Sequence, residues 1–407
     1  MQLFAFALLA FIFTGCASYT EKARDMVVAF EAQNYDAAAE KVKALAAKKD
    51  QDEALHLVEL GTIYHVAGRY KEAIETFQQA EKLAGWSDYT SISQEAGSVL
   101  VNESVKTHKL DNYERVLISM YLAIDYTLLG QWESALVEAR RVNHQLGQMI
   151  REGHPTYLQN GFAKYLAGML FERNGEWNDA WVDYKQLHQW DPTFPLNPVG
   201  LLRMSNKLKS EEDVRRYKKL FPNAPKFQLS PQEGEVVLLA EVGKAPQKFP
   251  DPEFQAVPKF APRYSRTRRL RIRSKQTNTF EESYQLFDIE RAAIIDLEEK
   301  RAGMIAKRLA SIAVKKVAVD AAAQKAQNKN VEAIGDMLIL LSERPDLRSW
   351  LLLPGSLQVA RITLPVGKHD LVVDELDANG NWIETRDLSS IEVRPQAMNF
   401  LNYRTRH

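Results

Sequence analysis

YERVLISMYLAIDYTLLGQWESALVEARR, residues 113–141, decides the fold of this chain. Its first half has apolar residues at helical spacing up to Gly130, which interrupts the pattern. A second apolar stripe runs from Trp132 to Val142. The stretch therefore predicts two helices joined by a tight turn. A helical hairpin of this size cannot bury both apolar faces alone, so we expect further copies stacked against it.

Three other places in the chain repeat this pattern. A tetratricopeptide repeat (TPR) pairs two helices over about 34 residues, with small residues where the helices cross closely and aromatic residues between them. In each copy an aromatic residue precedes a close-packing alanine by three positions; the pairs are Tyr35 and Ala38, Tyr70 and Ala73, Trp132 and Ala135, and Trp177 and Ala180. We therefore predict a divergent TPR-like α-solenoid, since three or more such units form a continuous core.

The copies are irregularly spaced. The interval between the second and third carries about 28 extra residues compared with one repeat, at positions 85–112, which we interpret as a long hairpin or an additional helix pair. The next interval carries about 11 extra residues and includes a loop at 153–155.

Composition bounds the class of protein. The 407 residues are enough for two or three domains, and 45% hydrophobic with 26% charged residues is ordinary for a globular protein. Lys plus Arg equals Asp plus Glu at 53 each, so the overall charge implies no polyanionic partner. The single cysteine excludes a disulfide framework and zinc sites built from cysteine pairs.

That cysteine follows an apolar N-terminal stretch. Residues 1–15 are almost wholly apolar and are short for a membrane span. The sequence Phe13-Thr14-Gly15-Cys16 resembles a bacterial lipobox, which implies a signal peptide over residues 1–15 and a diacylglyceryl group on Cys16. Ala17 follows the cysteine, and by this resemblance we expect a lipid-anchored protein on the periplasmic side of the outer membrane. The alternative is an ordinary secretory signal or a short anchor.

The first helix of each repeat should line the concave face of the array, where such arrays usually bind peptides or helices. The predicted partner-binding residues on this face are Thr62, His65, Tyr165, Met169, Glu172 and Arg173. The alternative is that they pack against the C-terminal domain, or that the groove is filled internally. The opening stretch also carries a charged cluster, which we interpret as structural ion pairs rather than an active site: Glu114, Arg115, Glu138, Arg140 and Arg141.

Prolines 222, 225 and 231 mark a connector, so we divide the chain after residue 15 into a helical-repeat domain, 16–226, and a C-terminal domain, 227–407. The apolar run 235–242 predicts a strand, and the proline-rich stretch 244–262 an extended crossing segment. Further on we expect two helices and then several strands; the helices cover 288–327 and 331–342, and the strands cover 358–364, 368–375, 382–386 and 390–394. The apolar run 337–341 is too short to span a bilayer and indicates burial. The predicted fold class is α+β, predominantly helical, with a smaller mixed α/β domain that has antiparallel strands.

Residues 263–275 contain seven basic residues and no acidic one. Arg269, Arg271 and Arg273 alternate with apolar residues, which predicts a solvated edge strand rather than a nucleic-acid site. Contact with anionic lipid or cell wall is the alternative.

Catalytic signatures are absent from the sequence, and the eight histidines form no recognisable ligand pair. The acidic residues Asp370, Asp374, Glu375 and Asp377 fit the rim of a hairpin better than a cation site. We therefore expect no catalytic residues, no metal and no cofactor.

Several motifs resemble an uncharacterised family of bacterial TPR lipoproteins of the cell envelope. They are Tyr113-Glu114-Arg115, Tyr121, Leu129-Gly130 and Glu138-Ala-Arg-Arg141, then Gly234-Glu-Val-Val237, Gly243-x-Ala-Pro246, Arg348-Ser-Trp350, Leu353-Pro354 and Gln358-Val-Ala-Arg361. The resemblance implies an envelope role without an established activity. We expect a non-enzymatic scaffold that holds an envelope protein of unknown identity and meets the membrane through its lipid. The alternatives are a cell-wall or glycan-acting enzyme and an accessory subunit of a secretion or pore assembly.

Overall fold

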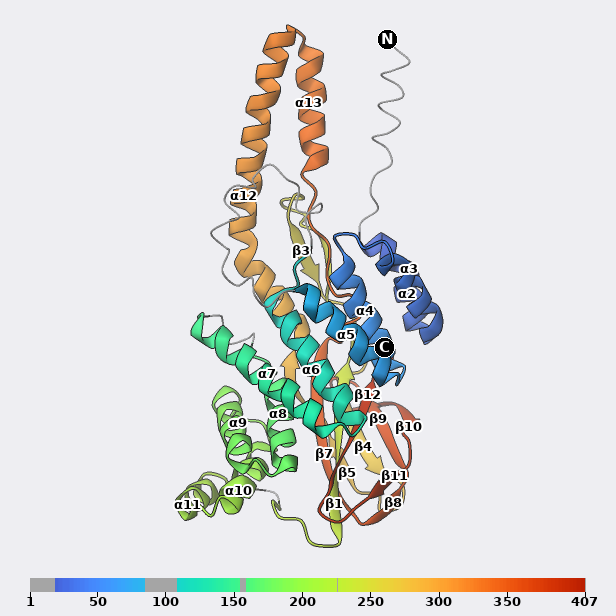
Figure 1. Ribbon diagram of the computed structural model, residues 1–407, viewed down its shortest axis with the longest axis vertical. Helices are drawn as coiled ribbons and strands as arrows, with labels where there is room; N and C mark the ends of the chain where they lie inside the picture. Colours follow the sequence, from blue (N-terminus) through green and yellow to red (C-terminus); the bar gives the residue numbers. More distant parts are fainter. Residues whose placement is uncertain (1–18, 85–107, 154–158, 225, 407) are drawn as a thin grey trace.

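The computed structural model describes residues 19–84, 108–153, 159–224 and 226–406 (Figure 1). The lipobox, most of the predicted 85–112 insertion and most of the 153–155 loop lie outside these residues. Within the described ranges no helix is both long enough and apolar enough to cross a membrane.

Consecutive helices in the first half of the chain pack as antiparallel pairs (Figure 1). They are α2 (Tyr19–Glu31) with α3 (Tyr35–Ala46), α4 (Glu53–Val66) with α5 (Tyr70–Ala84), α6 (Asn112–Leu128) with α7 (Trp132–Arg151), α8 (Gly161–Asn174) with α9 (Trp177–Trp190), and α10 (Asn197–Lys207) with α11 (Glu211–Leu220). The TPR-like array is therefore confirmed. The pair α10 and α11 was not recognised as a further copy.

The repeat residues have the packing roles that the pattern predicts. All four alanines of the aromatic–alanine pairs are fully buried. A Cβ on Gly61 would lie 2.6 Å from the Phe77 ring, and one on Gly168 would lie 2.7 Å from the Tyr184 ring. In these two pairs, α4 with α5 and α8 with α9, the helices thus approach at a glycine and leave room for an aromatic ring of the second helix.

The second half of the chain forms two four-stranded sheets and two short strand pairs. Sheet A has the order β12-β1-β7-β6, and sheet C has the order β10-β9-β4-β5. The strands are β1 (Glu233–Val242), β2 (Gln247–Pro250), β3 (Pro258–Ala261), β4 (Arg269–Ser274), β5 (Phe280–Glu282), β6 (Tyr284–Asp288), β7 (Ser356–Pro365), β8 (Gly367–His369), β9 (Leu371–Leu376), β10 (Trp382–Asp387), β11 (Ile391–Val393) and β12 (Met398–Arg404). All pair antiparallel except β12, which runs parallel to β1.

Sheet A is the middle layer of three. Val236 and Leu238 of β1 face sheet C, whereas Val237 and Leu239 face the helices, because successive side chains of a strand point to opposite sides. One apolar cluster accordingly joins the helical array to sheet A, and a second lies between the two sheets. The expected connector around residue 226 joins α11 to β1. One apolar core nevertheless includes residues from both sides of this connector.

Four expectations for the C-terminal half need correction. Strand β4 pairs with β5 and β9, so it is not an edge strand. The proline-rich stretch 244–262 contains the short antiparallel pair β2 and β3. The last strand is β12, whose parallel partner lies about 160 residues earlier and leaves no local signal. Finally, the 337–341 run is not wholly buried, because Met337 and Leu338 are exposed.

The helices of this half form a hairpin. Helix α12 (Ile289–Ala326) and helix α13 (Lys329–Ser342) pack on each other and extend beyond the rest of the molecule (Figure 1). The chain then returns through residues 343–355 to β7.

Candidate functional site

The inner face of the array, formed by α4, α6 and α8, is covered by the chain itself. Trp350, which is 1% exposed, lies against the Phe77 and Tyr121 rings, and its Nε1–H donates to Thr62 Oγ1 at 2.9 Å. The next two backbone N–H groups, of Leu351 and Leu352, donate to the Glu59 carboxylate at 2.6 and 3.0 Å. Residues 348–353 therefore occupy the place where a peptide ligand would lie in an open array.

Arg348 binds the start of this segment to the array through ion pairs. Its guanidinium donates to Asp346 at 2.6 Å and to Asp52, immediately before α4, at 3.0 Å. Both Arg348 and Asp52 are buried, so the pair is shielded from solvent screening.

A second polar contact joins α4 and α6 to β1. The ring of His65 lies between two carboxylates, with Nδ1 at 2.5 Å from Asp125 and Nε2 at 2.8 Å from Glu241. Glu241 also accepts hydrogen bonds from Tyr121 at 3.0 Å and from Arg404 at 2.8 Å. Burial alone would lower the pKa of His65, but the two carboxylates raise it to about 10.

The chemistry available to His65 follows from this geometry. At neutral pH the ring is an imidazolium, and each of its N–H groups is engaged by a carboxylate. A general base needs an unprotonated nitrogen near the operating pH. The arrangement is therefore an ion-paired structural link between the array and sheet A.

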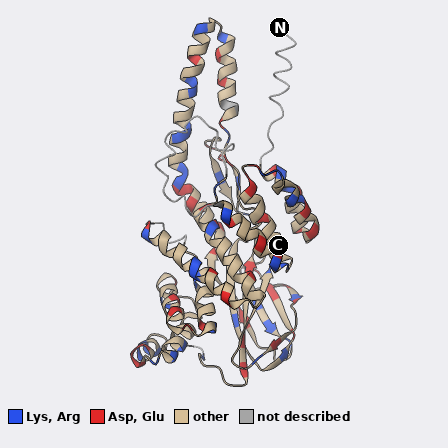
Figure 2. Cartoon of the chain, viewed as in Figure 1, with Lys and Arg blue, Asp and Glu red and all other residues tan. Residues whose placement is uncertain are grey.

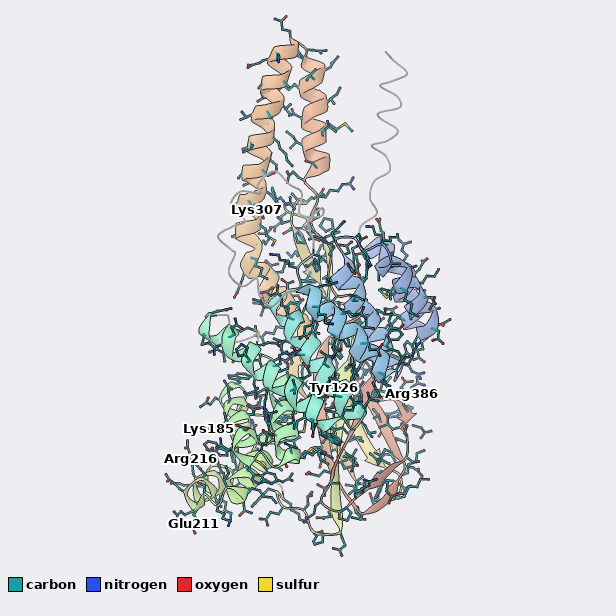
Figure 3. All side chains as sticks on the ribbon, in the orientation of Figure 1. Tyr126, Lys185, Glu211, Arg216, Lys307 and Arg386 are labelled. Carbon is teal, nitrogen blue, oxygen red and sulfur yellow. The ribbon has the colours of Figure 1, made fainter. Side chains whose placement is uncertain are left out.

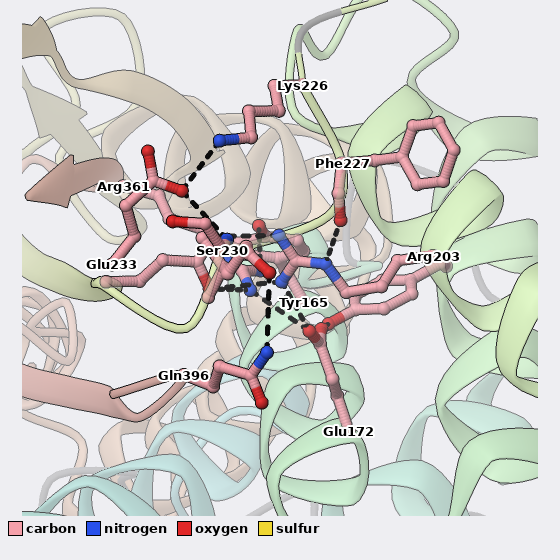
Figure 4. A network of polar contacts seen from close by, with 12 residues as sticks. Tyr165, Glu172, Arg203, Lys226, Phe227, Ser230, Glu233, Arg361 and Gln396 are labelled. Carbon is pink, nitrogen blue, oxygen red and sulfur yellow. Dashed lines mark hydrogen bonds and ion pairs between the residues drawn. The ribbon is translucent and has the colours of Figure 1, made fainter. Parts of the chain in front are cut away.

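A third contact joins α8 and α10 to sheet A (Figure 4). Arg361 on β7 donates to Glu172 at 3.1 Å and to Glu235 at 2.6 Å. Arg203 on α10 donates to the same two carboxylates at 2.6 and 2.9 Å. Burial alone would raise the pKa of Glu172, but the two guanidinium groups lower it to about 2. We call these four residues the Arg–Glu network.

Most of the six predicted partner-binding residues bond to the C-terminal domain or lie inside the core. Thr62, His65 and Glu172 bond to Trp350, Glu241 and Arg361 respectively, as described above, and the Tyr165 hydroxyl accepts from Arg361 at 3.3 Å. Met169 is buried. Arg173 is exposed and lies over the Trp132 ring at 3.4 Å. A partner could reach the buried members only by displacing these contacts.

The charged cluster of the opening stretch makes local and inter-helix contacts. Arg140 pairs with Glu176 at 2.6 Å, and Arg141 pairs with Glu81 on α5 at 2.5 Å and with Glu138 at 3.2 Å. Glu114 caps the start of α6 and also accepts from the Trp350 N–H at 3.4 Å. Arg115 donates to the Leu110 carbonyl at 3.2 Å.

The three arginines of β4 pair with carboxylates on neighbouring strands. Arg269 and Arg271 contact Glu282 at 3.2 and 2.6 Å, and Arg273 contacts Asp374 at 3.5 Å. Of the acidic residues near the β9–β10 turn, Asp370 and Asp377 accept hydrogen bonds from neighbouring side chains, Asp374 from Thr385, and Glu375 from Tyr403. These residues do not converge on one point.

Among the described residues, Asp50, Asp52 and His56 offer three ligand atoms within 4.8 Å of one another. The carboxylate of Asp52, however, already meets Arg348 at 3.0 Å and Lys22 at 4.0 Å. Two positive side chains beside the same carboxylate would repel a metal ion, so we assign no metal site there.

An open cavity of about 390 Å³ lies where the array meets the carboxyl ends of β1 and β12. The α2–α3 and α4–α5 turns form one side, with Tyr35 and Tyr70. The other side carries basic groups. The lining contains one carboxylate, Glu31, and His65 lies at its edge. Its basic side chains are Lys244, Arg263, Arg404 and Arg406. Glu31 pairs with Lys244 at 2.8 Å. Arg263 donates to the backbone carbonyls of Ala245 and Leu351, so those bonds leave its charge unneutralised.

The sequence analysis assigned no contact to the C-terminal members of these interactions, although three of them stand in the motifs quoted there; the residues are Glu235, Glu241, Trp350, Arg361 and Arg404. One signal was present: Glu235 and Glu241 stand at both ends of an otherwise apolar strand, six residues apart and so on the same face. A charge on a strand buried on both faces needs a partner, which the sequence does not name.

No protein-family model and no curated protein matches this chain. Solved structures with a similar fold include the MamA protein, with a TM-score of 0.35 and 15% identity over 49% of this chain and 87% of that one. A tetratricopeptide repeat protein from Parabacteroides merdae has a TM-score of 0.34 and 19% identity, over 51% and 68% of the two chains. PilF from Pseudomonas aeruginosa has a TM-score of 0.33 and 15% identity, over 52% and 80%. Because these scores are low, the fold assignment rests on the helix pairs described above.

Proposed function

We propose that this protein is a lipid-anchored scaffold of the cell envelope, without enzymatic activity, that holds a protein partner on the periplasmic side of the outer membrane. The observation that carries the proposal is the basic cavity beside a TPR-like array whose inner face is already covered. Since residues 348–353 take the usual ligand position, the partner enters at the cavity. In this lining Lys244 is paired with Glu31 and Arg404 with Glu241. The remaining basic groups, Arg263 and Arg406, favour an acidic segment of the partner.

The geometry of the cavity disfavours the glycan-acting enzyme. Glycoside hydrolysis generally uses two carboxyl groups that flank the scissile bond. The lining of this cavity supplies one carboxylate, Glu31, and it is paired with Lys244. At the cavity edge, His65 is held as an imidazolium.

Capture of the partner tests the cavity. The lipidated protein is crosslinked in intact envelopes and purified, and its partners are compared with those of Arg406→Glu. Arg406 is exposed in the cavity lining, so charge reversal leaves the core unchanged. The control is Lys219→Glu on α11, an exposed position outside the lining. Selective loss of a partner with Arg406→Glu supports the proposal; equal capture by both variants contradicts it.

Membrane attachment is tested separately at Cys16. The wild-type protein should fractionate with the outer membrane and carry the mass of a diacylglyceryl group at its N-terminal cysteine. Cys16→Ser should remain unprocessed and lack that lipid. A Cys16→Ser protein that is processed and membrane-bound like the wild type would refute lipid anchorage while leaving the partner experiment intact.

A further inference from the structure

The α12–α13 hairpin leaves the body of the molecule soon after it begins. Ile289, Ala293 and Leu297, at the start of α12, are buried against the core. From Ile305 to Ala326 the helix continues for about 33 Å, and α13 packs along it (Figure 1). Lys307 lies near the point of departure (Figure 3). We call residues 305–342 the projecting hairpin.

Ion pairs at a solvent-exposed margin link the two helices of the projecting hairpin. Lys316 of α12 contacts Glu332 and Asp336 of α13 at 3.2 and 2.8 Å, and Asp320 of its own helix at 2.9 Å. These three are all of the acidic residues between positions 305 and 342. At the base, Lys315 contacts Glu343 at 2.5 Å. The contact between the helices also has a close approach, since a Cβ on Gly335 would lie 2.3 Å from Val319.

The outer side of the projecting hairpin is apolar. Val317 is 70% exposed on α12, and Ile334 and Met337 are 60% and 58% exposed on α13. Further exposed apolar side chains are Leu309, Val314 and Leu338. Figure 2 shows both helices as mainly uncharged, with blue and red positions at intervals along them. A helical hairpin in water normally keeps large apolar side chains out of solvent, and exposed apolar surface of this kind marks a site of interaction.

The charge that remains on the outer side is positive. Residues 305–342 carry six basic side chains against three acidic ones, and all three acids contact Lys316, so the exposed Lys325 and Lys329 near the tip belong to a net positive excess. An apolar helical surface accompanied by lysines is the combination that binds the interface of a bilayer containing anionic lipids.

The first described residues lie near the segment through which the chain returns from the projecting hairpin. Tyr19 stacks on His56 near the start of α4, and Asp52, just before α4, pairs with Arg348, which follows α13 closely in the chain. Cys16 precedes Tyr19 by three residues, so a lipid on Cys16 would enter the bilayer within about 10 Å of this point. A membrane within about 10 Å of Tyr19 would be within reach of the projecting hairpin, which extends about 33 Å.

We propose that the projecting hairpin is a membrane-docking element, whose apolar outer side lies on the anionic bilayer that also holds the Cys16 lipid. The second part of this statement rests on the lipid anchorage proposed above. Together the lipid and the hairpin form two attachment points, which bind more stably than one and set the orientation of the scaffold on the membrane.

Depth-dependent quenching tests the docking. Single-cysteine variants Val317→Cys and Met337→Cys of the lipidated full chain, in which the lipid blocks Cys16, carry a polarity-sensitive fluorophore. The vesicles contain phosphatidylethanolamine, phosphatidylglycerol and a lipid-attached quencher. We expect a blue shift and quenching at both sites and neither at the control, Lys219→Cys. Vesicle-bound protein without quenching at both sites overturns the proposal. Crosslinking of Val317→Cys between two copies without quenching also overturns it and assigns the surface to a second copy.

A second measurement does not need the lipid. The mature chain beginning at Ala17 contains every described residue. It should bind vesicles that contain phosphatidylglycerol better than vesicles of phosphatidylcholine alone. Adding Val317→Asp and Met337→Asp, at exposed positions, should weaken that binding by about tenfold or more. Unchanged binding overturns the proposal. If Cys16 instead proves to carry no lipid, anchorage fails while this result for the hairpin still stands.

Discussion

Replacing Arg361 with methionine should destabilise the protein strongly. Arg361 is buried in the Arg–Glu network and contacts Glu172 and Glu235 at 3.1 and 2.6 Å. Its removal leaves two buried carboxylates with only Arg203 as a cation. Breaking a buried ion pair by removing one partner costs about 3–5 kcal/mol, a large fraction of the 5–15 kcal/mol that holds a typical domain folded.

The measurement is guanidinium denaturation of the mature chain, followed by tryptophan fluorescence. The matched control is Arg140→Met, because Arg140 is 53% exposed and its ion pair with Glu176 should contribute at most about 1 kcal/mol. Adding Glu235→Gln to Arg361→Met should recover part of the loss, since one unpaired charge disappears. An Arg361→Met variant as stable as Arg140→Met would refute the interpretation of the network as the link between array and sheet.

Acid provides an independent check on the same network. The pKa of Glu172 in the folded protein is about 2, below its ordinary value of 4.5. A depressed carboxyl pKa contributes stability that is present above about pH 4.5 and is lost as the pH falls towards 2. In Arg361→Met the pKa of Glu172 should rise, so acid should remove less stability from the variant than from the wild type. An identical acid dependence would contradict this.

Three further changes test single features of the fold. Because the pKa of His65 is raised to about 10, the stability that its charge contributes is full below about pH 6.5 and declines as the pH rises towards 10. ¹⁵N NMR should show the ring protonated at about pH 8. Titration of the ring near its ordinary pKa would contradict the ion-paired geometry. Trp350→Ala should cost about 3–5 kcal/mol in denaturant unfolding, since it empties the inner face of the array, and a loss below about 1 kcal/mol would show that the segment packs loosely. Gly61→Ala should cost about 1–3 kcal/mol by pressing a methyl group on Phe77, whereas Gly303→Ala, with nothing within 4 Å of the new Cβ, should be neutral or stabilising in the same assay.

Local patterns predicted much of the helical half correctly. The four aromatic–alanine pairs located the repeats because each repeat packs mainly on its sequence neighbours, so the residues that recognise one another stay close in the chain. The strand β1 was also predicted, from an apolar run of the correct length. The fifth helix pair was missed because it carries no aromatic–alanine pair at the same spacing.

The candidate site was harder to predict than the helices. His65 was placed on the inner face by repeat register, yet its two carboxylates come from positions 125 and 241. Trp350 stood out in sequence only as part of a short motif that resembles a family of lipoproteins. The exposed side of α13 was predicted to be buried. An apolar run in the sequence does not reveal whether its side chains pack in a protein core or remain on the surface.

By itself the sequence determined the repeat pairs, their turns and the alternation of the strands, since these depend on residues a few positions apart and on backbone geometry. Only the tertiary structure decided that the inner face is closed by residues 348–353, and that the charges of β1 and β7 meet those of the array. It also left large apolar side chains of the projecting hairpin, such as Val317 and Ile334, exposed to solvent. The physical reason is that a buried charge or ring requires a partner but does not specify its position in the chain, and the three-dimensional packing supplies it from far away.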